Sequence, residues 1–467
     1  MVNVHDHTID DFLNSRNASE ADFAKDGSKV AFTVYEGFKD FKDEPFSEVE
    51  VLFIKNHKIE SFYKQGWANF SPKISNSGER LAYLSKKGED YRLSVYDFGS
   101  KSEQEIVVDG SAVSLQWEGD NSLIVLIKDK DQKKAEKDEG DDGYLFEEDH
   151  RFDSLWRLNL VSGFKRITKG LQVWEYDVNG DKVAAITSSL PYEWSWYEAG
   201  VSLIDLNDRK VKKIYSKKDR QVAKPRLSPN NNTLLFLESL WSDRGVNSGD
   251  VVSIDLNSLK SRNVTYGDEE SYSEMQWKNE REFYALSNRD GTFSLYLFSG
   301  NKRKALWSKV GSVHKPWSPS FSVSNDQAVL SFESYKQPNE IFLIDLKNGK
   351  EKIVTNINKR LEGCKSYYSE KVSWKSKDGL MISGLFRSAG KTAPLMVIVH
   401  GGPTGSSTDS FIGMSTIYLS HGYSVFLPNY RGSVGRGRKF AELNVGDMGG
   451  MDLQDILSGI EYLRREK

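Results

Sequence analysis

The chain has 467 residues, which exceeds one ordinary domain and suggests about three by length alone. It is 38% hydrophobic, 28% charged and 12% aromatic, a composition that excludes a disordered chain. Because 64 Lys and Arg stand against 67 Asp and Glu, the net charge is −3, which argues against a general nucleic-acid binder. No apolar run approaches the roughly 20 residues of a membrane-spanning helix.

The start of the chain and its cysteine content bear on location. The first residues show no basic segment followed by an apolar core, so no secretory signal is predicted. Cys364 is the single cysteine and cannot form an internal disulfide, and both observations favour a reducing cytoplasm. With one cysteine and seven scattered histidines, a zinc site of the Cys/His cluster type is not expected.

Residues 18 to about 357 repeat a loose pattern of a polar turn, an apolar strand, a second strand that ends near an Asp, and a polar link. The turns recur at spacings of about 42 to 61 residues, in the range of propeller blades. Most turns precede a strand-length run rich in β-branched or aromatic residues. These runs are 29–35, 80–85, 122–127, 182–187, 233–238, 282–287 and 328–333.

The second strand of each unit is the more regular one. Its best copies are 94–97, 201–206, 252–256 and 341–346. Seven such units, each with four antiparallel strands, predict an N-terminal all-β, seven-bladed β-propeller over residues 1–360. The Gly-His and Trp-Asp signature of WD40 repeats is absent, and a pair of β-sandwiches or a β-helix is the alternative that the pattern leaves open.

Two segments stand out within these repeats. The charged insertion 128–150 is interpreted as a solvated loop, with an acidic arm for a partner as the alternative. The aromatic segment 191–197 has two interpretations, the lining of a ligand funnel or packing between blades.

The character of the sequence changes after residue 360. Two alternating strands around Lys377-Asp378-Gly379 predict a hairpin, and apolar strands then alternate with helices. This order predicts the N-terminal portion of an α/β domain over residues 361–467. The predicted strands are 367–374, 380–387, 395–399 and 424–427, and the predicted helices are 411–420 and 453–465.

Three motifs in this region carry a resemblance. They are His400-Gly-Gly-Pro403, Asn429-Tyr-Arg-Gly-Ser433 with two further glycines, and Gly446-Asp447 with Asp452 and Asp455. Behind a propeller, they resemble the prolyl oligopeptidase family, and most of all its acylaminoacyl-peptidase and dipeptidyl-peptidase-like branch. That family joins an N-terminal β-propeller to a C-terminal α/β-hydrolase domain, so the resemblance covers nearly the whole chain.

The resemblance implies a serine-type oligopeptidase that releases acylaminoacyl or dipeptidyl units from short peptides. Acyl transfer needs N–H donors aimed at the developing oxyanion, and the family position that supplies one matches Gly402. By the same resemblance, His400 supports the oxyanion loop. A simple turn at residues 401–403 is the alternative, and for Arg431 a scaffold role is favoured over ligand contact.

The resemblance implies no metal or organic cofactor, and its expected partners are short peptide substrates, with neither nucleic acid nor membrane. A homo-oligomer is left open. A non-catalytic propeller that binds or scaffolds other proteins is one rival function, and an esterase on the same fold is the other.

The expected catalytic triad is missing from the sequence. In α/β-hydrolases the nucleophile sits in Gly-x-Ser-x-Gly, followed by an acid and then a His, and the 467 residues contain no such motif. We therefore expect a chain that stops before the nucleophile, is inactive alone, and leaves strand 395–399 at an apolar sheet edge. Other candidates fail on position or chain order: Ser406, Ser407, Ser433, His421, Asp447, Asp452 and Asp455.

Overall fold

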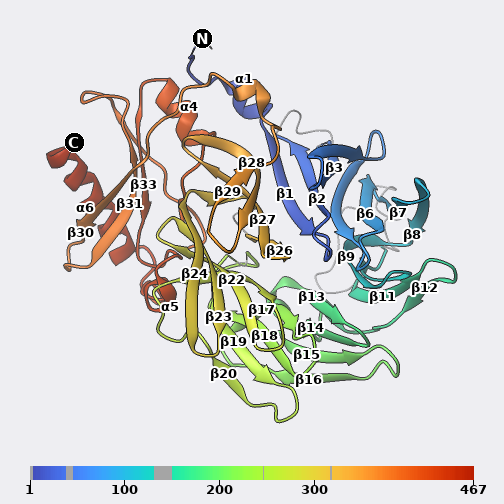
Figure 1. The fold of residues 1–467 in the computed structure, drawn as a ribbon. Helices are drawn as coiled ribbons and strands as arrows, with labels where there is room; N and C mark the ends of the chain where they lie inside the picture. Colours follow the sequence, from blue (N-terminus) through green and yellow to red (C-terminus); the bar gives the residue numbers. More distant parts are fainter. Residues whose placement is uncertain (1–3, 38–45, 131–149, 246, 316–317) are drawn as a thin grey trace, which may run out of the picture.

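The computed structural model describes residues 4–37, 46–130, 150–245, 247–315 and 318–467. Within these ranges, a series of antiparallel sheets surrounds a common centre, and a separate mixed sheet with helices lies beside them (Figure 1). The arrangement fits a β-propeller followed by the start of an α/β unit. Most of the charged insertion 128–150 lies outside the described residues.

The first sheet contains eight strands and divides into two four-stranded units, β1–β4 and β5–β8. The units meet through one parallel pair, Ser47 with Ala68, whereas the neighbours within each unit are antiparallel. The strands are β1 (Arg16–Phe23), β2 (Lys29–Glu36), β3 (Ser47–Phe53), β4 (Lys58–Phe62), β5 (Ala68–Ile74), β6 (Arg80–Lys87), β7 (Asp90–Asp97) and β8 (Ser102–Val108).

Four four-stranded sheets and one five-stranded sheet continue around the centre, each with strands that pair mostly in chain order. The four-stranded sheets are β9 (Ser111–Gly119), β10 (Ser122–Lys128), β11 (Asp153–Asn159), β12 (Gly163–Arg166); β13 (Gln172–Asn179), β14 (Lys182–Ser188), β15 (Gly200–Asp205), β16 (Val211–Tyr215); β17 (Gln221–Leu227), β18 (Thr233–Ser239), β19 (Asp250–Asp255), β20 (Ser261–Asn263); and β21 (Ser271–Trp277), β22 (Glu282–Arg289), β23 (Thr292–Ser299), β24 (Lys302–Val310). The five-stranded sheet is β25 (Ser312–Val313), β26 (Ser322–Ser324), β27 (Gln327–Ser334), β28 (Gln337–Asp345) and β29 (Glu351–Ile353).

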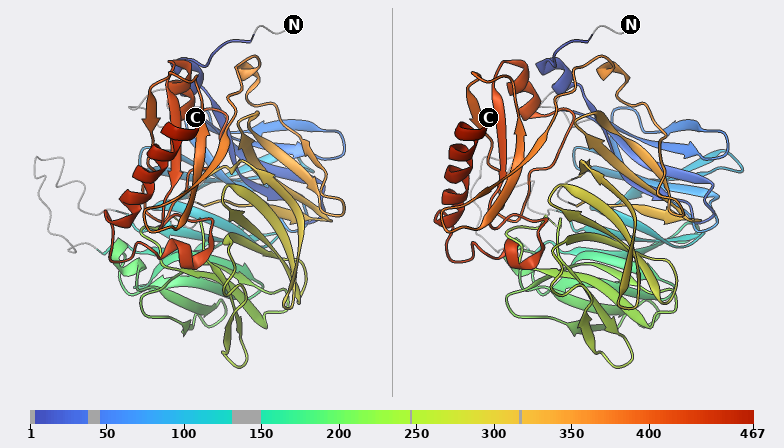
Figure 2. Two further views of the ribbon diagram at one scale, coloured as in Figure 1. Left: turned by 90° about the vertical axis from the view of Figure 1, so that its left-hand side faces the viewer. Right: turned by 60° about the vertical axis from the view of Figure 1, so that its left-hand side comes forward.

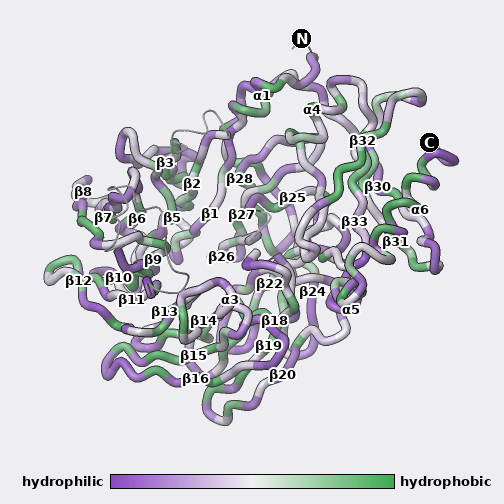
Figure 3. Tube along the Cα trace, turned by 180° about the vertical axis from the view of Figure 1, so that it is seen from behind, coloured by the Kyte–Doolittle hydropathy of each residue, from purple (hydrophilic) through white to green (hydrophobic). Residues whose placement is uncertain are grey.

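The apolar strand that follows the polar turn is the second strand of its sheet, for example β2, β6 or β10. It is buried along its middle, because neighbouring sheets cover both of its faces. In β10, for example, every residue from Leu123 to Ile127 is buried. A strand covered on both sides reads as a continuous apolar run, which explains why the seven runs in the sequence located these strands. Figure 3 shows the same distribution, with hydrophobic residues along the strands and hydrophilic residues at many turns.

Three of the third strands, β7, β15 and β19, end in an aspartate for a structural reason. The carboxylates of Asp97 and Asp255 accept N–H groups of the turn that follows, as Asp255 does from Ser258 at 2.7 Å. Such bonds let a short polar side chain stabilise a tight turn, and they lower the pKa of both aspartates. The Asp that recurs in the sequence is therefore a turn residue.

The ring of sheets closes where β1 meets the five-stranded sheet. Asn339 Oδ1 accepts the N–H of Ala18 at 2.8 Å, and Ser331 Oγ donates to the Ala18 carbonyl at 2.7 Å. Phe32 and Ile341 pack in one core cluster across the same junction. Closure therefore rests on packing and side-chain hydrogen bonds between two sheets, since β2 is the one strand among the described residues that pairs with β1.

The C-terminal sheet has the order β30-β31-β33-β32. Strand β32 runs parallel to β33, its one neighbour among the described strands, so it lies at an edge of this sheet and is shorter than the predicted strand 395–399. The sheet consists of β30 (Glu370–Lys375), β31 (Met381–Arg387), β32 (Leu395–Val397) and β33 (Ser424–Asn429). The helices of this region are α4 (Met414–Ser420), α5 (Gly437–Ala441) and α6 (Met451–Glu466).

Helices α4 and α6 cover opposite faces of this sheet. Phe426 of β33 packs with Leu463 of α6, whereas the neighbouring Val425 and Leu427 pack with Leu419 of α4. Successive strand residues point to opposite faces, so β33 is buried on both sides. Figure 2 shows α6 on the outer side of the sheet, away from the propeller.

The residues before β1 reach across to the C-terminal part. The N–H of His5 donates to the Gly363 carbonyl at 2.9 Å, and the Lys365 N–H donates to the His5 carbonyl at 2.8 Å. Helix α1 (Ile9–Leu13) follows, with Thr8 and Asp11 forming a capping box. A short 3₁₀ helix, η1 (Lys359–Leu361), precedes the segment to which His5 pairs.

The aromatic segment 191–197 separates into two environments. It contains the single-turn helix α3 (Glu193–Trp196), in which Trp196 is buried and packs against Trp241 with ring centroids 6.0 Å apart. Trp194, in contrast, is 42% exposed. Packing between sheets is thus the role of Trp196.

None of the helices in the described ranges combines the length and the apolar character that crossing a membrane requires.

Gly459 of α6 tests the packing of this helix on the sheet. A Cβ there would lie 2.7 Å from Phe426 Cζ and 2.8 Å from Trp374 Cε2. We expect Gly459→Ala to lower the free energy of unfolding by about 1–3 kcal/mol through overpacking, measured by urea denaturation. Gly119→Ala is the control, because a Cβ at Gly119 meets nothing within 4 Å. Equal stability of the two variants would contradict this packing.

Candidate active site

The His400-Gly-Gly-Pro403 segment leaves β32 and turns toward the propeller. Gly401 and Gly402 are exposed, whereas Thr404 and Gly405 are buried. We call residues 400–407 the glycine loop. It is held by β33 and the residues after it, since Val434 N–H donates to the Gly405 carbonyl at 2.9 Å.

His400 lies between two residues of the Asn429-Tyr-Arg-Gly-Ser433 motif. Its ring stacks on Tyr430, with centroids 4.6 Å apart and planes at 13°. The Tyr430 hydroxyl donates to the His400 carbonyl at 2.7 Å. Nδ1 donates to the Gly401 carbonyl at 3.0 Å, which leaves Nε2 to accept the Ser433 hydroxyl at 2.8 Å. Both ring nitrogens and the backbone carbonyl of this histidine are thus engaged in fixing the loop.

Asn429 clamps the other end of the glycine loop. Its Oδ1 accepts the Ser407 N–H at 2.7 Å, and its Nδ2 donates to the Ser407 carbonyl at 3.1 Å. The sequence analysis did not assign a role to Asn429. The sequence signal that could have indicated this role is that the His400-Gly-Gly-Pro403 and Asn429–Ser433 motifs occur in one chain. Each motif supplies hydrogen-bond partners for the segment that contains the other.

Gly402 is the residue at which the loop presents its backbone. No residue in the described ranges accepts a hydrogen bond from the Gly402 N–H, and the residue is exposed. Its φ of +124° disfavours any residue with a side chain, and a Cβ there would lie 2.5 Å from Thr404 N. The loop therefore requires glycine here and leaves one N–H donor free.

The propeller contacts the glycine loop directly. The hydroxyl oxygens of Ser242 and Thr404 lie 2.7 Å apart, and Ser242 N–H donates to Thr404 Oγ1 at 2.9 Å. Asn247 Nδ2 adds a longer contact of 3.4 Å to the Thr404 carbonyl. Because Thr404 is two residues from Gly402, the segment after β18 helps to set the geometry of the exposed N–H.

Ion pairs hold the start of the α/β unit on the propeller around α5. Arg220 donates to both carboxylate oxygens of Glu442, at 2.6 and 3.3 Å. Arg438 donates to Glu442 at 2.9 Å and approaches Glu238 and Asp250 at 3.5 Å. A bidentate arginine fixes orientation as well as distance, so this contact also limits how the two parts tilt.

Arg431 is the centre of an ion cluster that is buried at Asp455 and exposed at Asp378. Its backbone N–H and guanidinium donate to Asp455 at 2.8–2.9 Å, and the guanidinium also donates to Asp378 at 2.9 and 3.1 Å. Asp455 is fully buried in α6. These bonds join the segment after β33 to helix α6 and to the turn between β30 and β31, so Arg431 acts as scaffold, the role that the sequence favoured.

Ser433 and His400 form a Ser–His pair, the contact by which a histidine can activate a nucleophile. Ser433, however, is fully buried and cannot reach a substrate. The Nδ1 atom of His400 faces a carbonyl and has no carboxylate partner. The pair therefore supports the loop, and the described residues offer no complete Ser–His–Asp arrangement around it.

Part of the C-terminal region matches a known protein family in sequence. Residues 410–467 match the family model described as "Prolyl oligopeptidase family". The chain is related to this family. The resemblance to this family is thereby confirmed, with a match that includes the motifs of residues 429–455 and begins after residue 403.

Two curated relatives and one solved structure illustrate the relationship. The chain is 27% identical to "Uncharacterized peptidase YuxL" of Bacillus subtilis over 197 residues, which are 40% of this chain and 29% of that protein. It is 30% identical to dipeptidyl-peptidase 5 of Porphyromonas gingivalis over 155 residues, 31% of this chain and 22% of that one. The matches thus span less than a third of either relative.

The solved structure of the Pyrococcus horikoshii acylaminoacyl peptidase superposes with a TM-score of 0.77 at 18% identity. The superposition covers 97% of this chain and 72% of that protein. At this identity the likeness concerns the fold, and it extends over the propeller as well as the C-terminal sheet.

The protonation of His400 has a measurable consequence. Burial lowers the pKa of His400, although the Gly401 carbonyl opposes the shift. As the pH falls below the unfolded-state pKa of about 6.5, the His400 imidazole takes up a proton in the unfolded chain while it is still neutral in the folded chain. We expect stability to fall as the pH drops from about 6.5 through the folded-state pKa.

Urea unfolding at pH 7.5 and pH 5.5 checks this expectation, with His400→Gln as the comparison. The variant lacks the titrating group, so its loss of stability over this interval should be smaller. An identical pH dependence of the two proteins would contradict a depressed pKa at His400.

The ion cluster around Arg431 gives a second prediction. Asp455→Asn leaves the buried guanidinium with one carboxylate, and removing one partner of a buried pair typically costs about 3–5 kcal/mol. Asp452→Asn, on the same helix, is the control, since Asp452 pairs with backbone N–H groups near the surface. Thermal or urea unfolding measures the stability of both variants. Equal stability of the two would contradict the scaffold role of Arg431.

Proposed function

We propose that this chain forms part of a serine-type oligopeptidase in which the Gly402 N–H helps to hold the oxyanion of the tetrahedral intermediate. One observation carries the proposal: Gly402 is an exposed residue whose N–H has no partner in the described structure, in a loop fixed by His400, Asn429 and Ser242. A donor that is held in place before the reaction needs no rearrangement when charge develops.

His400 is proposed as a positioning residue. It supports the glycine loop through Tyr430 and Ser433 and is not the general base, since both ring nitrogens are occupied. The nucleophilic serine, the acid and the base are proposed to come from outside these 467 residues, because the sequence contains no Gly-x-Ser-x-Gly. On this proposal the 467-residue chain alone does not hydrolyse peptides.

We propose two domains for this chain. Residues 1–360 would form a seven-bladed propeller, with the eight-stranded sheet counted as two blades, and residues 361–467 would begin the α/β-hydrolase domain. The Ser242–Thr404 contact supports a propeller that covers the active site. Such a cover admits short peptides and excludes folded proteins.

The substrate class is proposed from the relatives. The names of the related proteins include acylaminoacyl and dipeptidyl peptidases, so release of an acylated residue or a dipeptide from a peptide N-terminus is the activity to test. A cytoplasmic location stays a prediction from the single cysteine.

The test is a pair of glycine substitutions, each made in the full-length natural protein. Gly402→Ala should lower kcat by about 100-fold or more, the usual cost of losing one oxyanion donor, because the new Cβ would meet Thr404 N at 2.5 Å. Gly401→Ala is the matched control, since a Cβ at Gly401 meets nothing within 4 Å.

Acylaminoacyl, dipeptidyl and simple ester substrates distinguish the rivals in the same assay. Turnover of esters alone would indicate an esterase on this fold. No turnover of any of them, with a fully folded protein, would favour a scaffold. Equal effects of the two glycine substitutions on kcat would contradict the role of Gly402.

A further inference from the structure

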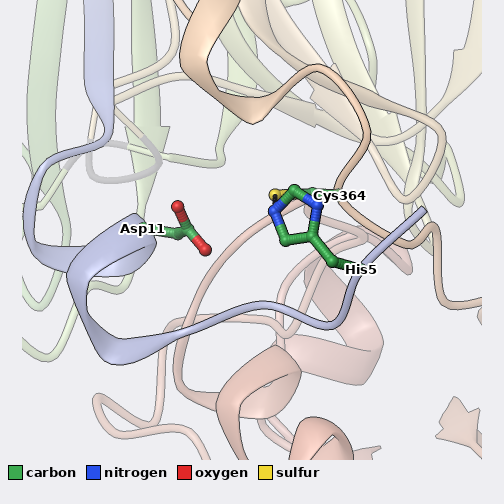
Figure 4. A group of neighbouring side chains, drawn as sticks. All are labelled: His5, Asp11 and Cys364. Carbon is green, nitrogen blue, oxygen red and sulfur yellow. Dashed lines mark hydrogen bonds between the residues drawn. The ribbon is translucent and has the colours of Figure 1, made fainter. Parts of the chain in front are cut away.

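Three potential metal ligands from distant parts of the sequence meet beside the junction of the two parts. His5 lies in the segment before α1, Asp11 lies in α1, and Cys364 follows η1. One ligand atom from each lies within 4.8 Å of the others. Figure 4 shows the His5 ring beside the Cys364 sulfur, with the Asp11 carboxylate turned toward them.

The distance between the nitrogen and the sulfur fits a shared ion. His5 Nε2 and Cys364 Sγ are 3.5 Å apart. Around a tetrahedral zinc ion, with Zn–N of about 2.0–2.1 Å and Zn–S of about 2.3 Å, the two ligand atoms are separated by about 3.5–3.6 Å. An ion could therefore bind both atoms without moving either residue far.

The backbone of this group is fixed in advance. His5 exchanges backbone hydrogen bonds with Gly363 and Lys365, the residues on either side of Cys364. Thr8 donates its N–H and its hydroxyl to Asp11 Oδ2, at 3.0 and 2.8 Å. This leaves Asp11 Oδ1 available, and its near charged partner is the Arg360 guanidinium at 3.6 Å.

The chemistry of the three donors selects the class of ion. A thiolate and an imidazole suit borderline ions such as Zn²⁺, whereas Mg²⁺ and Ca²⁺ prefer sets of oxygen ligands. A thiolate and a carboxylate would together balance two positive charges. Because His5 is exposed, water can complete a fourth position.

We propose that His5, Asp11 and Cys364 form a Zn²⁺-class metal site that fastens the segment before the propeller to the segment that leaves it. Binding forms a metal–sulfur bond, and the proton of the Cys364 thiol passes to solvent. This proposal departs from the prediction made from the sequence, which expected no metal and no zinc site of the Cys/His type, since a single cysteine suffices here beside a histidine and a carboxylate. The inference does not depend on the proposed peptidase function.

Co²⁺ titration of the 467-residue chain tests the site. Tetrahedral Co²⁺ with one thiolate gives visible ligand-field bands and a near-ultraviolet sulfur-to-cobalt absorption, and Zn²⁺ should displace both. Cys364→Ser should abolish the sulfur band and weaken binding by about 100-fold or more, beyond the 10–100-fold that loss of an outer-shell partner commonly costs. His57→Ala, at an exposed histidine in the β3–β4 turn, should leave both unchanged.

Arg360→Gln should strengthen metal binding, whereas Cys364→Ser should weaken it. The Arg360 substitution removes the cation that lies 3.6 Å from Asp11 Oδ1, so we expect Co²⁺ to bind several-fold more tightly. Weaker or unchanged binding in this variant would count against Asp11 as a ligand.

Alkylation of the unaltered chain does not depend on the folding of any variant. With one cysteine in the sequence, intact mass after iodoacetamide treatment reports on Cys364 alone. Stoichiometric Zn²⁺ should slow alkylation at least tenfold, and Mg²⁺ should not. Equal alkylation rates with and without Zn²⁺, or cobalt spectra without a sulfur band, would overturn the proposal.

Discussion

The rest of the candidate site depends on how the His400 ring is held between Tyr430 and Ser433. Stacking fixes the plane of the ring, and the hydrogen bonds at Nδ1 and Nε2 fix its rotation. With the histidine immobile, the backbone after it can remain in a conformation that only glycine adopts readily, with φ of +124° at Gly402. A free N–H donor can then be presented without the loop collapsing onto it.

The propeller contacts the glycine loop and helps to fix its position. Ser242 bonds to Thr404 within the glycine loop, and the bidentate pair of Arg220 with Glu442 fixes the C-terminal part on the same side of the propeller. Any movement between the two parts would therefore alter the position of the Gly402 N–H. This links the large β-structure to the chemistry proposed for the loop.

Much of the fold could be predicted, and the reason is burial. The second strands, such as residues Leu123–Ile127 of β10, are covered on both faces and appear in the sequence as apolar runs. The short outer strand β20 gave no such signal, because three mostly exposed residues have no periodicity. The glycine loop was found from its motif, but the clamp by Asn429 and the group of His5 with Cys364 depend on contacts between distant segments, which no local pattern records.

The most direct test of the account is a crystal structure of the intact protein bound to a peptide boronate or trifluoromethyl ketone, which mimics the tetrahedral intermediate. The account predicts that the Gly402 nitrogen lies about 2.7–3.1 Å from the tetrahedral oxygen, with the His400 ring still stacked on Tyr430 as here. An inhibitor oxygen bound away from the glycine loop, or a Gly402 N–H turned toward a protein acceptor, would contradict it.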